Sequence, residues 1–272
     1  MQLLHANWRF ICFMDSRIIE LRWASIAFAV LAFVFVAWPG IDLTVAARFH
    51  QNGWAWLLAP DSPLIAWPYH GLPHFGRLLV AIFLGLWLAS FVRRFASLRA
   101  LRLLFLFLLA GALVGPVVVV DAGLKNHFGR ARPAQTEAFG GNLAFTPAFA
   151  ISDQCQRNCS FVSGHVATTA FIMVFGWLGS PRLRRRWLLA SLAAAAYMSL
   201  IRMSVGGHFL SDCLFAWFAT YFSLWLVEFA FARAAWLDWA RTAFVASAGF
   251  AAGCLADTQR RLPASLILAG RQ

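Results

Sequence analysis

The chain has 272 residues, of which 61% are hydrophobic and only 12% are charged. A soluble domain of this size has about 25% charged residues, so the composition excludes an ordinary soluble protein and indicates a membrane protein. The formal net charge of +12 at pH 7 would suit nucleic-acid binding. The arginines, however, lie in short groups between apolar segments, as they do in membrane proteins, so we expect no nucleic-acid partner.

Six apolar segments predict an all-α, polytopic membrane protein that is a bundle of six transmembrane helices. The segments are 23–38, 78–92, 101–120, 163–179, 187–203 and 209–232. The chain then divides into an N-terminal segment (1–22), a six-helix membrane domain (23–232) and a C-terminal tail (233–272). A further apolar run at 242–256 is too short to be predicted as a span. The first segment is expected to be an uncleaved anchor, because no small-x-small cleavage site follows it.

The distribution of basic residues predicts the orientation of this bundle. With six spans, sixteen of the 23 Lys and Arg fall on the side that holds both termini, and seven fall on the other side. The positive-inside rule therefore places both termini in the cytoplasm. Three connections lie outside. The 40–76 connection is rich in Trp and Pro and is expected to cover the bundle at the membrane surface. The 121–162 connection is a long polar loop of the kind that is usually functional, and 204–207 is a four-residue turn.

The first polar motif is Lys125-Asn-His-Phe-Gly-Arg-Ala-Arg132-Pro133, at the outer end of the third span. If this stretch is helical, Lys125 and Arg132 lie two turns apart on one face and Pro133 ends the helix. Basic residues are common at the ends of spans, so the motif alone fits a membrane anchor as well as an anion site. Arg130 could likewise add to an anion site or face lipid headgroups. Lys125 is the only lysine in the chain.

The second motif, Cys159-Ser-Phe-Val-Ser163-Gly164-His165, opens the fourth span. Ser163 and Gly164 fit ordinary helix capping, but they also offer a hydroxyl and free N–H groups to an anion. A histidine beside such a site, here His165, can donate a proton to a leaving oxygen.

The third motif, Arg202-Met-Ser-Val-Gly-Gly-His208-Phe-Leu-Ser-Asp212, joins the fifth and sixth spans. His208 and Asp212 lie one helical turn apart, so a carboxylate can set the tautomer of the imidazole and leave its other nitrogen free to attack. Ionisable residues in or beside a span indicate a functional site. Because all three motifs lie on the outer face of the predicted topology, they together predict one phosphate site.

These motifs resemble the signature of the type 2 phosphatidate phosphatase superfamily, which also contains vanadium haloperoxidases. That signature reads Lys-x6-Arg-Pro, then Pro-Ser-Gly-His, then Ser-Arg-x5-His-x3-Asp. The chain matches every titrating position and departs from the pattern at Val162 and Ile201, where the family has Pro and Ser. Ile201 removes one hydroxyl that could bind phosphate.

The resemblance implies roles for the matched residues. The phosphate-binding residues would be Lys125, Arg132, Ser163, Gly164 and Arg202. His208, oriented by Asp212, would attack phosphorus to form a phosphohistidine, and His165 would protonate the leaving oxygen. The fixed cations would take the part that Mg²⁺ plays in other phosphoryl transfers, so the resemblance implies a metal-independent phosphoric monoester hydrolase without a cofactor.

The loop from Phe139-Gly-Gly to the second motif is similar to that of lipid A phosphatases of Gram-negative envelopes. This similarity implies a membrane lipid phosphatase that acts at the outer face of the inner membrane, with lipid A as a candidate substrate. Undecaprenyl diphosphate, phosphatidylglycerol phosphate and phosphatidate remain open, as does transfer of phosphate from one lipid to another. A haloperoxidase would be soluble, and a membrane scaffold would leave the clustered His165, His208 and Asp212 unexplained.

Cys155 and Cys159 lie in the loop that the arginine distribution places outside the cytoplasm. Disulfides persist in that compartment, and two cysteines four residues apart reach bonding distance in a helix or a tight turn. We therefore expect a disulfide between them.

Overall fold

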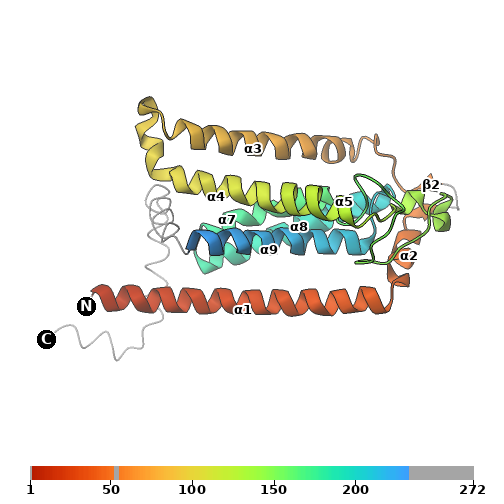
Figure 1. Cartoon of the computed structure of the whole chain (residues 1–272), viewed down its shortest axis with the longest axis horizontal. Coiled ribbons are helices and arrows are strands. Elements are labelled where there is room, and N and C mark those ends of the chain that lie inside the picture. The colour runs from red at the N-terminus through yellow and green to blue at the C-terminus, as the bar shows by residue number, and fades with distance from the viewer. Residues whose placement is uncertain (1, 52–54, 233–272) are drawn as a thin grey trace.

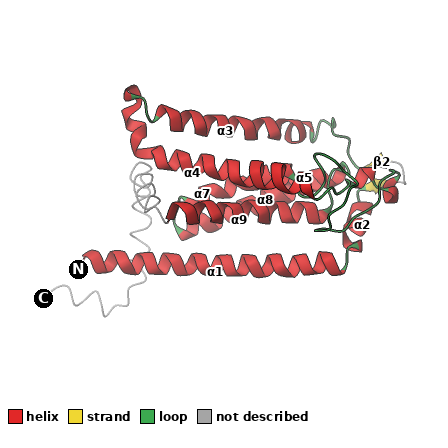
Figure 2. Ribbon diagram, in the orientation of Figure 1, coloured by secondary structure: helices red, strands yellow, loops and turns green. Residues whose placement is uncertain are grey.

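The structure is a computed structural model that describes residues 2–51 and 55–232. Most of these residues are helical, and the strands among them, β1 (His50–Gln51) and β2 (Ala55–Trp56), form one short antiparallel hairpin (Figure 2). The predicted all-α, polytopic fold is therefore confirmed. The predicted tail, 233–272, with its apolar run at 242–256, lies outside the described residues.

Five helices in the described part of the chain are long and apolar enough to cross a membrane. They are Arg17–Ala37, Trp67–Ala89, Arg93–His127, Pro181–Ser204 and Leu210–Phe231. A sixth apolar helix, Gly164–Trp177, is shorter. At ~1.5 Å per residue it covers about 21 Å, which is less than the ~30 Å of a hydrocarbon core. The number of six spans therefore stays a prediction.

The elements that make up these spans follow one another with few breaks (Figure 1). They are α1 (Gln2–Ala37), η1 (Trp67–Gly71) with α3 (Leu72–Ala89), η2 (Arg93–Leu101) with α4 (Arg102–Ala112), η3 (Leu113–Leu124) and α5 (Lys125–His127), α6 (Gly164–Ala170) with η6 (Phe171–Met173) and α7 (Val174–Trp177), α8 (Pro181–Ser204) and α9 (Leu210–Ala232). Helix α1 begins at Gln2, so the predicted N-terminal segment, 1–22, continues into the first span without a break. The η3 stretch is a π-helix that contains Pro116, which lacks the N–H that a regular helix needs.

Helices α1 and α3 lie on opposite sides of the bundle, with α4, α8 and α9 between them (Figure 1). The core contains fully buried aromatic side chains such as Phe107, Trp177 and Tyr221. At the end of the bundle away from the outer loops, Arg184 donates two hydrogen bonds of 2.7 Å to Glu20. An Arg17–Glu228 ion pair lies beside it. Charges inside a membrane bundle are tolerated when they are paired, and these pairs join α1 to α8 and α9.

The outer connections gather at the other end of the bundle (Figure 1). They hold α2 (Gly40–Ala47), the β1–β2 hairpin, the one-turn helices η4 (Pro133–Gln135) and η5 (Glu137–Phe139), and an irregular loop up to Ser163. Gly206 has a φ of +65°, and a Cβ atom there would collide with the ring of Trp56. The 40–76 connection thus packs over the third motif, as a cover is expected to do.

Candidate active site

Backbone hydrogen bonds join the three motifs to one another, so residues nearly 90 positions apart form one site. The bonds run from Ser160 N to Arg130 O (2.9 Å), from Ser163 N to Asp212 O (3.0 Å) and from Ala134 N to Gly206 O (3.0 Å). The first two bonds each connect two of the motifs, and the third connects Ala134, directly after the first motif, to the third motif. The predicted convergence of the three motifs is therefore present in the fold.

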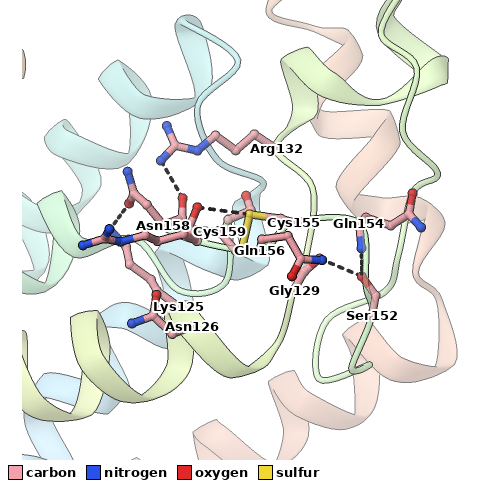
Figure 3. Close-up of a disulfide and its surroundings, with 12 residues drawn as sticks. Lys125, Asn126, Gly129, Arg132, Ser152, Gln154, Cys155, Gln156, Asn158 and Cys159 are labelled. Atoms are coloured by element: carbon pink, nitrogen blue, oxygen red, sulfur yellow. Dashed lines mark hydrogen bonds between the residues drawn. A yellow bond between two sulfur atoms is a disulfide. The ribbon is translucent and has the colours of Figure 1, made fainter.

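Lys125 and Arg132 converge by a route that differs from the helical one predicted. The helix ends at His127, Gly129 has a φ of +62°, and Arg132 is extended. The two cations instead meet at Asn158, whose Oδ1 accepts a hydrogen bond from Lys125 Nζ (3.1 Å) and whose backbone oxygen accepts one from Arg132 Nη2 (2.9 Å; Figure 3). A glycine in the left-handed conformation turns the chain, so helical periodicity cannot relate the two residues.

A disulfide joins Cys155 to Cys159, with their Cα atoms 5.6 Å apart (Figure 3). The predicted pairing is confirmed. Asn158 lies inside this small ring with a φ of +54°, and the N–H of Cys159 donates to the backbone oxygen of Lys125 (3.3 Å). The ring therefore holds Asn158 against both cations.

Ser163 occupies the N-cap position of α6, yet its side chain does not cap the helix. Its Oγ is buried and has no hydrogen-bond partner among the described residues. A Cβ atom on the neighbouring Gly164 would lie 2.9 Å from Lys125 Nζ and 2.7 Å from Asp121 Oδ1. Asp121 also forms an ion pair of 3.2 Å with Lys125. The unpaired hydroxyl favours the anion-site interpretation of the motif over simple capping, because buried polar groups are normally hydrogen-bonded.

Arg202 is the third cation, and its side chain is buried at the end of α8. Its Nε and Nη1 atoms have no hydrogen-bond partner in the part of the chain that the structure describes. The guanidinium lies 4.5 Å from the ring centre of Tyr69, and a Cβ atom on Gly207 would be 2.6 Å from Nη2. Gly207, which has no side chain, thus leaves room for Arg202, whose Nε and Nη1 donors can bind a ligand.

His208 is fully buried in the turn between α8 and α9. Its Nδ1 lies 2.8 Å from the backbone oxygen of Ser160. A carbonyl can only accept, so Nδ1 carries the proton and Nε2 keeps its lone pair. Burial, and then the charges of Arg202, Arg132 and Lys125, hold the pKa of His208 well below its usual value, which keeps the ring neutral.

Asp212 does not make the direct hydrogen bond to His208 that was predicted. Its Oδ2 is 3.7 Å from His208 Nδ1 and instead accepts hydrogen bonds from Ser160 Oγ (2.6 Å) and the N–H of Phe209 (2.8 Å). Asp212 therefore contacts the histidine through Ser160, whose hydroxyl it binds and whose backbone oxygen holds the ring. The physical reason is that the other carboxylate oxygen, Oδ1, neutralises Arg130 (2.6 Å).

Arg130 neither binds at an open anion site nor faces lipid headgroups. It is buried, and its guanidinium also donates to Asp42 Oδ2 (2.8 Å) and to Ser211 Oγ (2.8 Å). Asp42, from α2, further accepts from the N–H of Ser211 (2.9 Å) at the start of α9. Burial raises the pKa of Asp42, against the opposing charge of Arg130. Two carboxylates and one guanidinium thus form a buried support behind His208.

His165 is half-buried in the first turn of α6. Its Nε2 donates to the backbone oxygen of Tyr69 (2.8 Å), and the two rings lie 5.6 Å apart. The 40–76 connection, through Tyr69, therefore contacts two residues of the site, His165 and Arg202.

Sequence reasoning missed four residues that position the site: Asp42, Tyr69, Asn158 and Ser160. Asp42 had a signal, because it is the single charged residue in an apolar stretch that follows a span. Tyr69 had none, because nothing local distinguishes it from other interfacial aromatics. Asn158 and Ser160 act through backbone atoms as well as side chains, and such contacts depend on the fold.

Three cations around a neutral histidine, at one end of a bundle of membrane helices, define a membrane-bound enzyme that handles phosphate. Comparison with known families gives the same class: residues 99–236 match the PAP2 superfamily. The chain belongs to this superfamily. The match contains all three motifs, and the family resemblance predicted from them is confirmed.

Three curated relatives are lipid A 4'-phosphatases. The protein of Francisella tularensis subsp. novicida (strain U112) is 32% identical over 198 residues, which cover 71% of this chain and 87% of the relative. Those of Rhizobium leguminosarum and Rhizobium etli (strain ATCC 51251) are each 33% identical and cover 71% of this chain, with 87% and 79% of the relatives aligned. No solved structure gives a significant match.

Proposed function

We propose that this bacterial membrane protein is a lipid phosphatase that removes the 4'-phosphate of lipid A at the outer face of the inner membrane. The observation that carries the proposal is a set of buried, unused donors next to a neutral histidine: Ser163 Oγ and Arg202 Nε and Nη1 have no partner among the described residues. Unsatisfied buried donors are costly, and a bound phosphate would satisfy them. The names of the three relatives support lipid A as the substrate.

Phosphate binding would use donors that come from separate elements. Arg202 and Ser163 have donors ready, whereas Lys125 and Arg132 would exchange their contacts with Asn158 for phosphate oxygens. The space that Gly164 leaves beside Lys125 Nζ is where these oxygens would lie. Fixed cations stabilise the charge on the equatorial oxygens, so the proposal needs no metal ion.

His208 would be the nucleophile. Its Nε2 lone pair attacks phosphorus and the bond from phosphorus to the lipid oxygen breaks. His165 enters this step as the imidazolium and gives its Nδ1 proton to that oxygen, while its Nε2–H keeps the hydrogen bond to Tyr69. Water then attacks the phosphohistidine, the P–N bond breaks, and His165 takes the proton from the water. The products are inorganic phosphate and a lipid with a free hydroxyl. The hydrogen bond from Nδ1 to Ser160 keeps His208 in the reactive tautomer throughout.

Phosphate release from purified lipids tests this proposal. The wild-type chain in detergent should release inorganic phosphate from lipid A and continue to do so in excess EDTA. His208→Gln should lose at least about a thousandfold in rate, as nucleophile removal does in other covalent mechanisms. Undecaprenyl diphosphate, phosphatidylglycerol phosphate and phosphatidate serve as competing substrates.

Three results would contradict parts of the proposal. Loss of activity in EDTA with recovery on adding Mg²⁺ would refute the metal-free mechanism. Phosphate that appears on a second lipid rather than in solution would identify a phosphotransferase. Faster release from one of the other lipids would replace lipid A as the substrate.

A further inference from the structure

An apolar groove runs along the bundle between α1, η3 and α9, starting at the end that holds the site. Its volume is about 350 Å³. Side chains from all three helices line it, among them Phe28 of α1, Leu124 of η3 and Ala219 of α9. The proposed chemistry at the phosphate site does not use this groove.

The groove and the phosphate site share the same two segments of the chain. Leu124 lines the groove and the next residue, Lys125, is a cation of the site. Val162 lines the groove and the next residue, Ser163, carries the unpaired hydroxyl. The groove and the candidate phosphate site therefore adjoin along two segments of the chain.

The length of the groove matches one leaflet of a bilayer. On α9 it extends from Phe215, one turn beyond Asp212, to Leu226. At ~1.5 Å per residue this distance is about 16 Å, which is roughly half of a ~30 Å hydrocarbon core. A lipid tail whose headgroup lies at the site would run along the groove toward the middle of the membrane.

We propose that this groove binds an acyl chain of the substrate lipid while the phosphate lies among Lys125, Arg132 and Arg202. The inference rests on the proposed lipid phosphatase function and adds a tail-binding site to it. A tail gains little hydrophobic free energy by leaving the bilayer for a groove, because the surrounding lipid is equally apolar. The groove acts by orientation: a held tail restricts where the phosphate can lie relative to His208.

A second apolar groove, lined by residues of α1, α8 and α9, provides a matched control. Its lining includes Ala24 of α1 and Trp217 of α9. None of the residues that line it is adjacent in the chain to a residue of the site. Ala24 and Ala219 are both half-buried alanines in an apolar groove, so the same substitution can be made at each.

The test compares Ala219→Trp with Ala24→Trp on two substrates of the same headgroup, one with long acyl chains and one with short chains. Ala219→Trp should lower kcat/KM for the long-chain lipid about tenfold, a size typical of steric changes in apolar pockets. It should change kcat/KM for the short-chain lipid less than about twofold, and Ala24→Trp should change neither. Thermal unfolding of each variant shows that it is folded.

The proposal is wrong if Ala219→Trp affects both substrates equally, if it affects neither, or if Ala24→Trp has the same effect. A wild-type chain that hydrolyses neither lipid would refute the phosphatase function instead. A separate experiment then still tests whether the groove binds a lipid tail. A lipid phosphate with a photoreactive diazirine in its tail is bound to the His208→Gln variant, and the cross-linked residues are identified. Cross-links should lie within 215–226 of α9 and be displaced by excess long-chain lipid. Cross-links at the second groove, or no displacement, would overturn the inference.

Discussion

The buried carboxylates Asp42 and Asp212 are the residues whose roles depend most on the geometry. Asp42 touches neither His208 nor the phosphate-binding donors; it holds Arg130 and the start of α9. Arg130 in turn holds Asp212, and Asp212 holds Ser160, the acceptor for His208. Asp42 is therefore a positioning residue at the far end of a chain of four contacts.

We predict that Asp42→Asn lowers kcat of the folded enzyme about tenfold with KM changed less than about twofold, as is usual when a supporting contact of an active-site group is lost. The amide places a donor against Arg130 or against the N–H of Ser211, so the support behind His208 shifts. Asp212→Asn should cost more, because it disturbs three hydrogen bonds at once. The measurement is steady-state kinetics normalised to the amount of folded protein.

Glu137→Gln is the matched control, since it neutralises an exposed carboxylate in the other long outer connection, 121–162. It should leave kcat unchanged. Removing one partner of a buried ion pair typically destabilises by about 3–5 kcal/mol, so Asp42→Asn should also lower the melting temperature. A lower melting temperature with wild-type kcat would show that Asp42 only stabilises the fold.

The pH dependence should report the neutral state of His208. Burial and three nearby cations lower its pKa, so the ring stays deprotonated as pH falls below 6.5, the usual value for histidine. Activity that needs the free Nε2 lone pair is lost only as pH falls through the lowered pKa. We therefore predict an acid limb of kcat/KM below pH 6.5.

Lys125→Gln should shift this limb to higher pH, because removing a cation favours the protonated ring. Both enzymes are assayed with one substrate, so ionisation of the substrate phosphate is common to the two profiles. A limb that stays in place or moves to lower pH would show that another group controls it. The overall rate should fall as well, since Lys125 also binds phosphate in the proposed mechanism.

At the scale of elements, the helices carry several side chains of the site, and the outer loops hold these side chains in position. The Cys155–Cys159 ring holds Asn158 against Lys125 and Arg132, which belong to separate segments (Figure 3). Closing so small a ring stabilises by about 2 kcal/mol on the chain-entropy model. Its larger consequence is that two cations keep a fixed separation before substrate binds.

We predict that replacing both Cys155 and Cys159 by Ser raises KM about tenfold while kcat changes less, because preorganised binding donors are lost and the nucleophile is not. Asn158→Ala in the oxidised protein should reproduce part of this effect. Cys213→Ser, which removes a buried cysteine outside the ring, serves as the control. A wild-type KM in the double serine variant would show that the disulfide ring does not organise Lys125 and Arg132 for substrate binding.

At the scale of the whole molecule, the bundle separates two kinds of polar group. The cations that we propose bind phosphate lie at one end, and the Arg184–Glu20 and Arg17–Glu228 pairs lie at the other. The proposed orientation places the first end outside the cytoplasm, where Glu137 is exposed, and Ser97 of η2 inside. Substrate would then reach the site from the outer leaflet.

Labelling of single new cysteines tests this orientation. Glu137→Cys should react with a membrane-impermeant maleimide applied from outside to intact inner membranes, and Ser97→Cys should react only after the membrane is opened. The unmodified chain provides the background from its own cysteines. The opposite pattern would reverse the orientation and place the phosphatase reaction in the cytoplasm.

The sequence by itself determined the class of this protein and predicted the residues that handle phosphate. Long apolar segments can only be helices in a bilayer, because every backbone polar group must be satisfied within the segment. Side chains such as Lys125, His208 and Arg202 are too costly beside a membrane to lie there without a function. These constraints are local, so composition and spacing reveal them.

Tertiary structure alone decided how those residues are held. Periodicity predicted that Lys125 and Arg132 share a helix face and that Asp212 binds His208 directly, and both contacts differ in the fold. The left-handed turn at Gly129 ends the helical relation, and a buried Arg130 draws one oxygen of Asp212 away. The partners that replace the predicted ones, Asn158 and the backbone oxygen of Ser160, are brought there by loops. Such contacts depend on where distant segments meet, and spacing along the chain does not contain that information.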